Sequence, residues 1–144
     1  MSAKIEFQIL WVDEGSVSLD VSVADGRSAF STNVVVPSDL LLSHVRRLNA
    51  FSKEIYGGIY DFTLGNFGEE FAYGGFTARL HFAEPGVLSI ACFVETGFFK
   101  FGNRRVADSA RIYLRAEVNS LDTFILEFEN LIAKKTHIAT LNCN

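Results

Sequence analysis

The beginning of the chain alternates between apolar and polar residues with a period of two, which is typical of half-buried β-strands. We expect strands over residues 4–12, 16–24 and 28–36. One face of the first strand would carry Ile5, Phe7, Ile9 and Trp11. The Asp25-Gly26 pair is a strong hairpin signal. These strands therefore predict an antiparallel meander with one solvated face.

Helical spacing replaces the alternation after Pro37. Apolar residues then recur every three or four positions, at Leu41, Leu42, Val45, Leu48 and Phe51. Ser38 is the predicted N-cap, and Asp39 would lie at the positive end of the helix dipole. We expect this helix to end near Tyr56, before two glycines.

A second group of strands follows the helix. We expect them at residues 59–64, 71–83, 87–96 and 109–118. The inward residues of the last strand would be Ala110, Ile112, Leu114, Ala116 and Val118. Glu84-Pro85-Gly86 predicts a tight turn, because Pro fixes φ and Gly accepts a positive φ. Residues 98–101 either continue the preceding strand or form a short extra one.

A second helix closes the predicted fold, capped by Asn119 or Ser120. Its apolar stripe comprises Leu121, Phe124, Ile125, Phe128, Leu131 and Ile132. Residues 136–144 would form a C-terminal tail of a single domain spanning residues 1–144. The predicted class is α+β, with antiparallel sheets in the order β-β-β-α-β-β-β-β-α and the helices packed on the apolar face. This order disfavours a doubly wound nucleotide-binding fold.

Composition and charge narrow the expected setting and partners. Cys92 and Cys143 lie far apart, which gives neither a disulfide framework nor a zinc spacing. The first residues lack a signal-peptide pattern, and no apolar run approaches the ~20 residues that span a bilayer. We therefore expect a cytoplasmic protein that binds no membrane. The net charge of −4 argues against nucleic acid as the main ligand; the Arg104-Arg105 pair and similar short basic pairs are interpreted as solvated.

The sequence contains no recognisable constellation of catalytic residues. The three histidines, His44, His81 and His137, lack metal-ligand spacing, and His44 is placed on the edge of the first helix. There is no GxSxG elbow and no P-loop. His81 shares a strand face with Arg79, which leaves a general base or a ligand contact open beside a simple solvated position. We expect no enzyme, no cofactor and no metal.

One composite surface remains as a candidate partner-binding site. If the strands over residues 71–83 and 109–118 share a sheet, its open face carries Arg79, His81, Arg111, Tyr113, Arg115 and Glu117. Arg and Tyr are typical anchor residues of protein interfaces. An ordinary solvated sheet face is the competing interpretation.

The 14 phenylalanines have two interpretations. Phe76, Phe82, Phe124 and Phe128 sit at periodic core positions. Alternatively, aromatic side chains line a cavity between sheet and helix that holds a small apolar ligand. Phe98, Phe99 and Phe101 cannot all face one core, so that segment is either sandwiched between layers or exposed. An exposed edge strand or this segment could mediate a homodimer.

Three segments, taken together, carry a resemblance to a known family. They are the strand-then-helix FSTNVVVPSDLLLSHVRRLNAF, the hairpin FTARLHFAEPGVLSIACFVE, and a strand running into SLDTFILEFENLI. Their order resembles the WapI-type family and related small bacterial proteins that act as immunity partners in polymorphic toxin systems. The resemblance covers roughly residues 15–133 and rests on element order and hydrophobic pattern. It implies a cytosolic, non-enzymatic protein that binds and neutralises a toxin domain, and it supplies no catalytic residues.

Overall fold

The computed structural model describes residues 2–144 and confirms an α+β fold of antiparallel sheets and two helices. The first sheet has the order β10-β1-β2-β3. Its strands are β1 (Ala3–Asp13), β2 (Ser16–Asp25), β3 (Ala29–Pro37) and β10 (Ile138–Asn142). The second sheet has the order β4-β5-β6-β9. Its strands are β4 (Ile59–Gly65), β5 (Gly75–Glu84), β6 (Val87–Glu95) and β9 (Ser109–Glu117).

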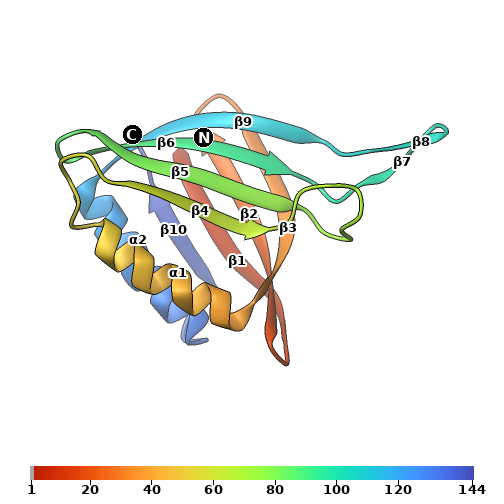
Figure 1. Ribbon diagram of the computed structural model, residues 1–144, viewed down its shortest axis with the longest axis horizontal. Helices are drawn as coiled ribbons and strands as arrows, with labels where there is room; N and C mark the ends of the chain where they lie inside the picture. The colour runs from red at the N-terminus through yellow and green to blue at the C-terminus, as the bar shows by residue number, and fades with distance from the viewer. Residues whose placement is uncertain (1) are drawn as a thin grey trace.

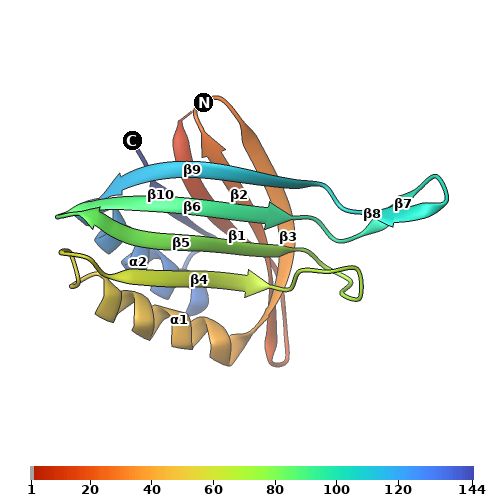
Figure 2. The ribbon, with the colours of Figure 1, turned by 45° about the horizontal axis from the view of Figure 1, so that its top comes forward.

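The two sheets lie one over the other with their strands crossing (Figure 1). The helices α1 (Ser38–Phe51) and α2 (Val118–Ile132) lie next to each other and pack on the apolar inner side. A separate two-stranded hairpin, β7 (Phe99–Phe101) and β8 (Arg104–Val106), extends away from the body between β6 and β9. Figure 2 shows that no helix covers the outward face of the second sheet.

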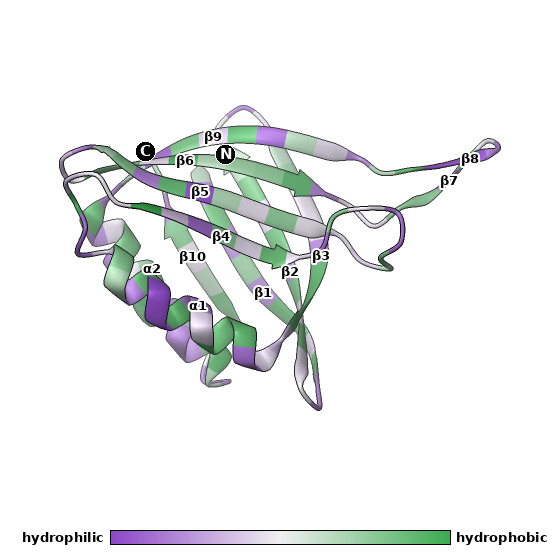
Figure 3. Cartoon of the chain, viewed as in Figure 1, coloured by the Kyte–Doolittle hydropathy of each residue, from purple (hydrophilic) through white to green (hydrophobic). Residues whose placement is uncertain are grey.

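Alternation along the strands determines which side chains enter the core. In β5 the buried apolar side chains are Phe76, Ala78, Leu80 and Phe82, of which Phe76 and Phe82 were predicted to lie in the core. The same pattern gives the strands alternating bands of hydrophobic and hydrophilic residues in Figure 3. None of the helices within residues 2–144 is both long and apolar enough to cross a bilayer.

The prediction for Trp11 was wrong, because the pairing of β1 with β2 shifts register between Ile9 and Trp11. A one-residue shift moves the following side chains to the opposite face. Ile5 and Phe7, before the shift, are buried, whereas the side chain of Trp11 is 41% exposed. The predicted alternation therefore holds only for the first part of the strand.

The predicted helix caps were also wrong. The N-cap positions are Pro37 and Glu117, and neither forms a side-chain capping hydrogen bond. Both helices continue directly from a preceding strand, and the Ser38 N–H donates to the Gly15 carbonyl in the β1–β2 turn. A neighbouring turn therefore takes the place of a side-chain cap. The first helix ends at Phe51 and not near Tyr56, and turns follow it.

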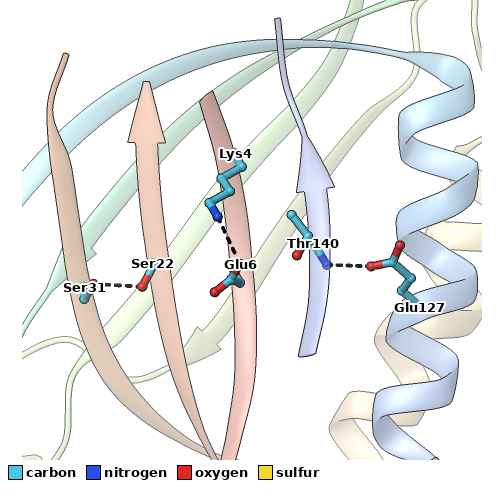
Figure 4. Close-up of polar contacts among 6 residues, drawn as sticks. All are labelled: Lys4, Glu6, Ser22, Ser31, Glu127 and Thr140. Carbon is cyan, nitrogen blue, oxygen red and sulfur yellow. Dashed lines mark hydrogen bonds and ion pairs between the residues drawn. The ribbon is translucent and has the colours of Figure 1, made fainter. Parts of the chain in front are cut away.

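The segment predicted as a tail contains a strand of the first sheet. β10 pairs antiparallel with β1, and it buries Ala139 and Leu141. Its backbone is also bound from the side by α2, because the Thr140 N–H donates to the Glu127 carboxylate over 2.9 Å (Figure 4). A strand of only five residues, whose partner lies at the other end of the chain, has too short a hydrophobic pattern to be recognised from the sequence. These residues were therefore predicted to form a tail.

Candidate functional site

The six residues predicted to form a binding surface all lie on the outward face of the second sheet. The predicted condition is met, because β5 and β9 belong to the same sheet. Along β9, four side chains alternate outward with buried neighbours. They are Arg111, Tyr113, Arg115 and Glu117. Arg79 and His81 occupy the corresponding outward positions of β5, between buried Ala78, Leu80 and Phe82. We refer to this surface as the open face.

β5 and β9 are not adjacent, and β6 runs between them. Its outward residues are small where the two neighbours carry large side chains. Ala91 pairs with Arg79 on one side and with Tyr113 on the other, and Ser89 pairs in the same way with His81 and Arg115. The small residues form the floor of a groove of about 620 Å³ with larger side chains on both sides. Neighbouring strands are about 4.8 Å apart, so the two walls stand roughly 10 Å apart.

Arg79 is held in place by its neighbour on the edge strand β4. Its guanidinium donates two hydrogen bonds to Asp61, of 2.8 and 3.0 Å. These bonds from Arg79 lower the pKa of the Asp61 carboxyl. Both side chains are more than half exposed, so the pair contributes little to folding stability. Its main structural effect is to hold the guanidinium toward the edge strand β4.

Arg111 is fixed by aromatic contacts at the opposite end of the open face. Its guanidinium carbon lies 4.6 Å from the ring centre of Phe93, in a cation–π geometry. Phe93 in turn stacks on Phe67, with 5.3 Å between the ring centres. A second hollow of about 310 Å³ lies beside this stack, and Arg79 and Tyr113 border both hollows.

Tyr113 projects from the middle of the open face. Its side chain is 68% exposed and forms no hydrogen bond to any residue between 2 and 144. Three arginines surround it, at positions 79, 111 and 115, and the same face carries the carboxylates of Asp61, Glu95 and Glu117. Asp25 of the first sheet also lines the groove. The open face therefore carries both signs of charge, but Arg111 and Arg115 have no ion-pair partner among residues 2–144. These two guanidinium groups are complementary to anionic side chains of a partner.

His44 is buried, so its predicted position on the helix edge was wrong. Its side chain is 5% exposed and bridges α1 to β4. Nε2 lies 2.8 Å from the Thr63 carbonyl, which can only accept, so Nε2 carries the proton and Nδ1 accepts from the Tyr60 hydroxyl. Burial lowers the pKa of His44, and the nearby Arg47 charge acts in the same direction. A satisfied buried imidazole indicates a structural role.

Aromatic rings fill the space between the sheets and the helices. Phe7 of the first sheet contacts Phe62 and Phe76 of the second sheet and Phe124 and Phe128 of α2, with ring centres 5.5–5.7 Å apart. An apolar hollow between β1, β2 and α2 measures about 10 Å³. This packing favours the core interpretation of the phenylalanines over a ligand cavity of several hundred Å³. Cys92 is free and buried in the same core, and burial raises the pKa of its thiol to about 12.

A further groove, between α1 and α2, was missed by sequence reasoning. Its volume is about 360 Å³, and its apolar lining includes Val17, Leu41, Leu42, Val45 and Ile132. Leu42 is 53% exposed although it was assigned to the apolar stripe of the helix. The signal was available in the run of three leucines at positions 40–42, because a single helix face cannot bury three consecutive residues.

No arrangement of catalytic groups emerges around the open face. Within residues 2–144, no three His, Cys, Asp or Glu side chains are grouped to hold a metal ion. The half-buried His81 makes no side-chain hydrogen bond to a described residue. No family model, no curated protein and no solved structure matches the chain.

Proposed function

We propose that the protein is a non-enzymatic binding module that recognises another protein through the open face. The observation that carries this proposal is the exposed Tyr113 between two oriented arginines. Asp61 positions Arg79, and Phe93 positions Arg111, so both guanidinium groups lose little conformational freedom on binding. Preoriented Arg and Tyr side chains around a groove are typical of the residues that dominate protein interfaces.

The arginines of the open face that have no ion-pair partner support a proposal for the chemistry of the partner. Arg111 and Arg115 have no carboxylate within ion-pair distance among residues 2–144, because the ion pairs there are Lys4–Glu6 and Arg79–Asp61. We infer a partner that presents acidic side chains to the groove. Three arginines spread over two strands are too few and too scattered to suggest nucleic acid.

A narrower form of the proposal is that the partner is a toxin domain and the protein acts as its immunity partner in the cytoplasm. The resemblance to the WapI-type family supports this immunity role. The open face supports it as well, because it presents Arg and Tyr side chains for contact. A growth assay with the toxin-like domain encoded nearest to this gene tests it. The wild-type protein should restore growth on co-expression, and the variant Arg111→Glu/Arg115→Glu should not.

The direct test is binding of the partner to matched variants. Tyr113→Ala should weaken binding at least ten-fold, because exposed aromatic anchors of this kind contribute most of the affinity. Arg46→Glu, an exposed charge reversal on α1, is the control and should bind like the wild type. If a purified partner binds Tyr113→Ala and Arg111→Glu/Arg115→Glu as tightly as the wild type, the open face is not the binding site.

A further inference from the structure

The β7–β8 hairpin is a preformed projection from the body of the molecule (Figure 1). Its strands pair Phe99 with Val106, Lys100 with Arg105, and Phe101 with Arg104. Gly102 has a φ of 64°, whereas Asn103 is not among the residues with a positive φ. This is the φ pattern of a type II′ turn, which matches the twist of a two-residue hairpin. The hairpin therefore has a defined shape before it meets any partner.

One face of this hairpin is mainly apolar but also carries Arg104, and the other face is cationic. Phe99 and Phe101 are 42% and 64% exposed, and they share a face with Val106 and Arg104. Lys100 and Arg105 lie on the opposite face. None of these three cations has an ion-pair partner within residues 2–144. The sequence left open whether residues 98–101 are sandwiched between layers or exposed, and the structure shows that Phe99 and Phe101 are exposed.

The apolar groove between α1 and α2 offers matching chemistry at another site on the same molecule. Leu41, Leu42, Val45 and Ile132 form its wall, and Leu42 is largely exposed. Glu129 lines the groove and Asp39 lies in the first turn of α1. The hydrogen bond from Ser38 to Gly15 brings the acidic turn at Asp13 and Glu14 beside it. Glu129 and Lys134 are the charged residues that line the groove itself, and the three further carboxylates lie near its Ser38 end.

We propose that the hairpin of one copy docks into this groove on a second copy. Phe99 and Phe101 would cover the exposed leucine surface, while Lys100, Arg104 and Arg105 would approach the surrounding carboxylates. Figures 1 and 2 place the hairpin tip far from both helices, so a chain cannot insert its hairpin into its own groove. A second copy supplies both the missing aromatic residues and the missing cations. An anionic membrane would match the hairpin alone and would leave the groove uncovered.

The proposed contact is heterologous, because it joins two different surfaces of the same chain. A two-stranded hairpin covers a small area, well below the ~1,200 Å² of a stable interface, so the association is weak and reversible. We expect monomers at low concentration and head-to-tail assemblies at high concentration. The contact leaves the open face free, so this proposal can be tested independently of the proposed function.

Sedimentation equilibrium of the purified protein from roughly 10 µM to 1 mM tests this proposal. The mean mass of the wild type should rise with concentration, and 0.5 M salt should reduce the rise. Phe101→Ser and Leu42→Glu should each remain monomeric, and both change exposed side chains, so neither should disturb the fold. Leu126→Glu is the matched control, because Leu126 is 63% exposed on α2 and does not line the groove.

The decisive measurement mixes the two defective variants. Phe101→Ser retains the groove and Leu42→Glu retains the hairpin, so together they should form a one-to-one dimer that cannot extend. A wild type that stays monomeric throughout would overturn the proposal. So would a mixture that stays monomeric, or a Leu42→Glu variant that still associates. Binding of the wild type, but not of Phe101→Ser, to vesicles of anionic phospholipid without self-association would identify the hairpin as a membrane contact instead.

Discussion

The outer faces of the two sheets are built from different side chains. On the first sheet, short or flexible polar residues pair with each other, as in Ser22 with Ser31 and Lys4 with Glu6 (Figure 4). On the second sheet, large planar side chains surround a groove with a floor of Ser89 and Ala91. A face satisfied by its own pairs is suited to water. A face that holds arginines in fixed orientations around an exposed tyrosine is suited to a partner.

The largest loss of stability should come from a substitution in the core that supports both sheets. Phe7→Ala should lower the free energy of unfolding by about 3–5 kcal/mol, because it deletes a ring that contacts both sheets and α2. Urea denaturation, followed by fluorescence and by circular dichroism, measures this loss and should show one transition. Trp11→Ala on the same strand is the control, followed by circular dichroism alone because it removes the one tryptophan of the chain. Its loss of stability should stay below about 1 kcal/mol. Two separate transitions would mean that the sheets fold independently.

An intermediate effect should distinguish the second sheet from the first by its dependence on pH. The folded-state pKa of His44 lies below its ordinary value of 6.5, because burial disfavours the imidazolium. Below pH 6.5 the unfolded chain therefore binds more protons at this residue than the folded chain, so stability falls as the pH drops. This loss should begin with the bond between α1 and β4, which supports the second sheet.

Urea midpoints between pH 7.5 and 5 measure the effect of His44. The wild type should lose stability over this range more steeply than His44→Gln, which cannot titrate there. Hydrogen exchange should show β4 opening before β1 as the pH falls. Equal slopes for the two proteins would show that another group controls the acid sensitivity.

The smallest effect on stability is expected from substitutions of the charged residues on the outer faces of the two sheets. Lys4→Gln on the first sheet and Arg79→Gln on the second should each leave the free energy of unfolding nearly unchanged, because the Arg79–Asp61 pair is exposed and the Lys4–Glu6 pair is partly exposed. The two changes should differ only in partner binding, which Arg79→Gln weakens and Lys4→Gln does not. A stability loss of about 2 kcal/mol or more for Arg79→Gln would make that arginine a structural residue.

Much of the fold could be predicted because strands β2, β3, β5 and β9 alternate with few errors. From Arg111 to Glu117 in β9, each outward residue follows an apolar residue that is buried or half-buried, so this outward set could be predicted directly. The predictions failed where a distant partner decides the outcome. The shift after Ile9 depends on the pairing with β2, and the burial of His44 depends on Tyr60 and Thr63, which follow it in β4.

The candidate site was predictable only in part for the same reason. Alternation identified the outward residues, but it did not reveal that β6 separates β5 from β9 with two small residues, which creates the groove. The groove between the helices required knowledge of how α1 meets α2. Asn49 donates to Glu129 across that contact, and no local pattern in the sequence indicates the pair.

The pairing of β1 with β10 means that the two sides of the first sheet form at different times during folding. β2 and β3 follow β1 at once along the chain, so this meander closes short loops, whereas Lys4 must find Asn142. Loop closure across almost the whole chain is entropically costly, and such non-local pairings form slowly. The first strand to be synthesised thus obtains its second neighbour only after α2 is in position. Until then β1 has an unpaired edge, and during this interval the folding chain is most exposed to misassembly.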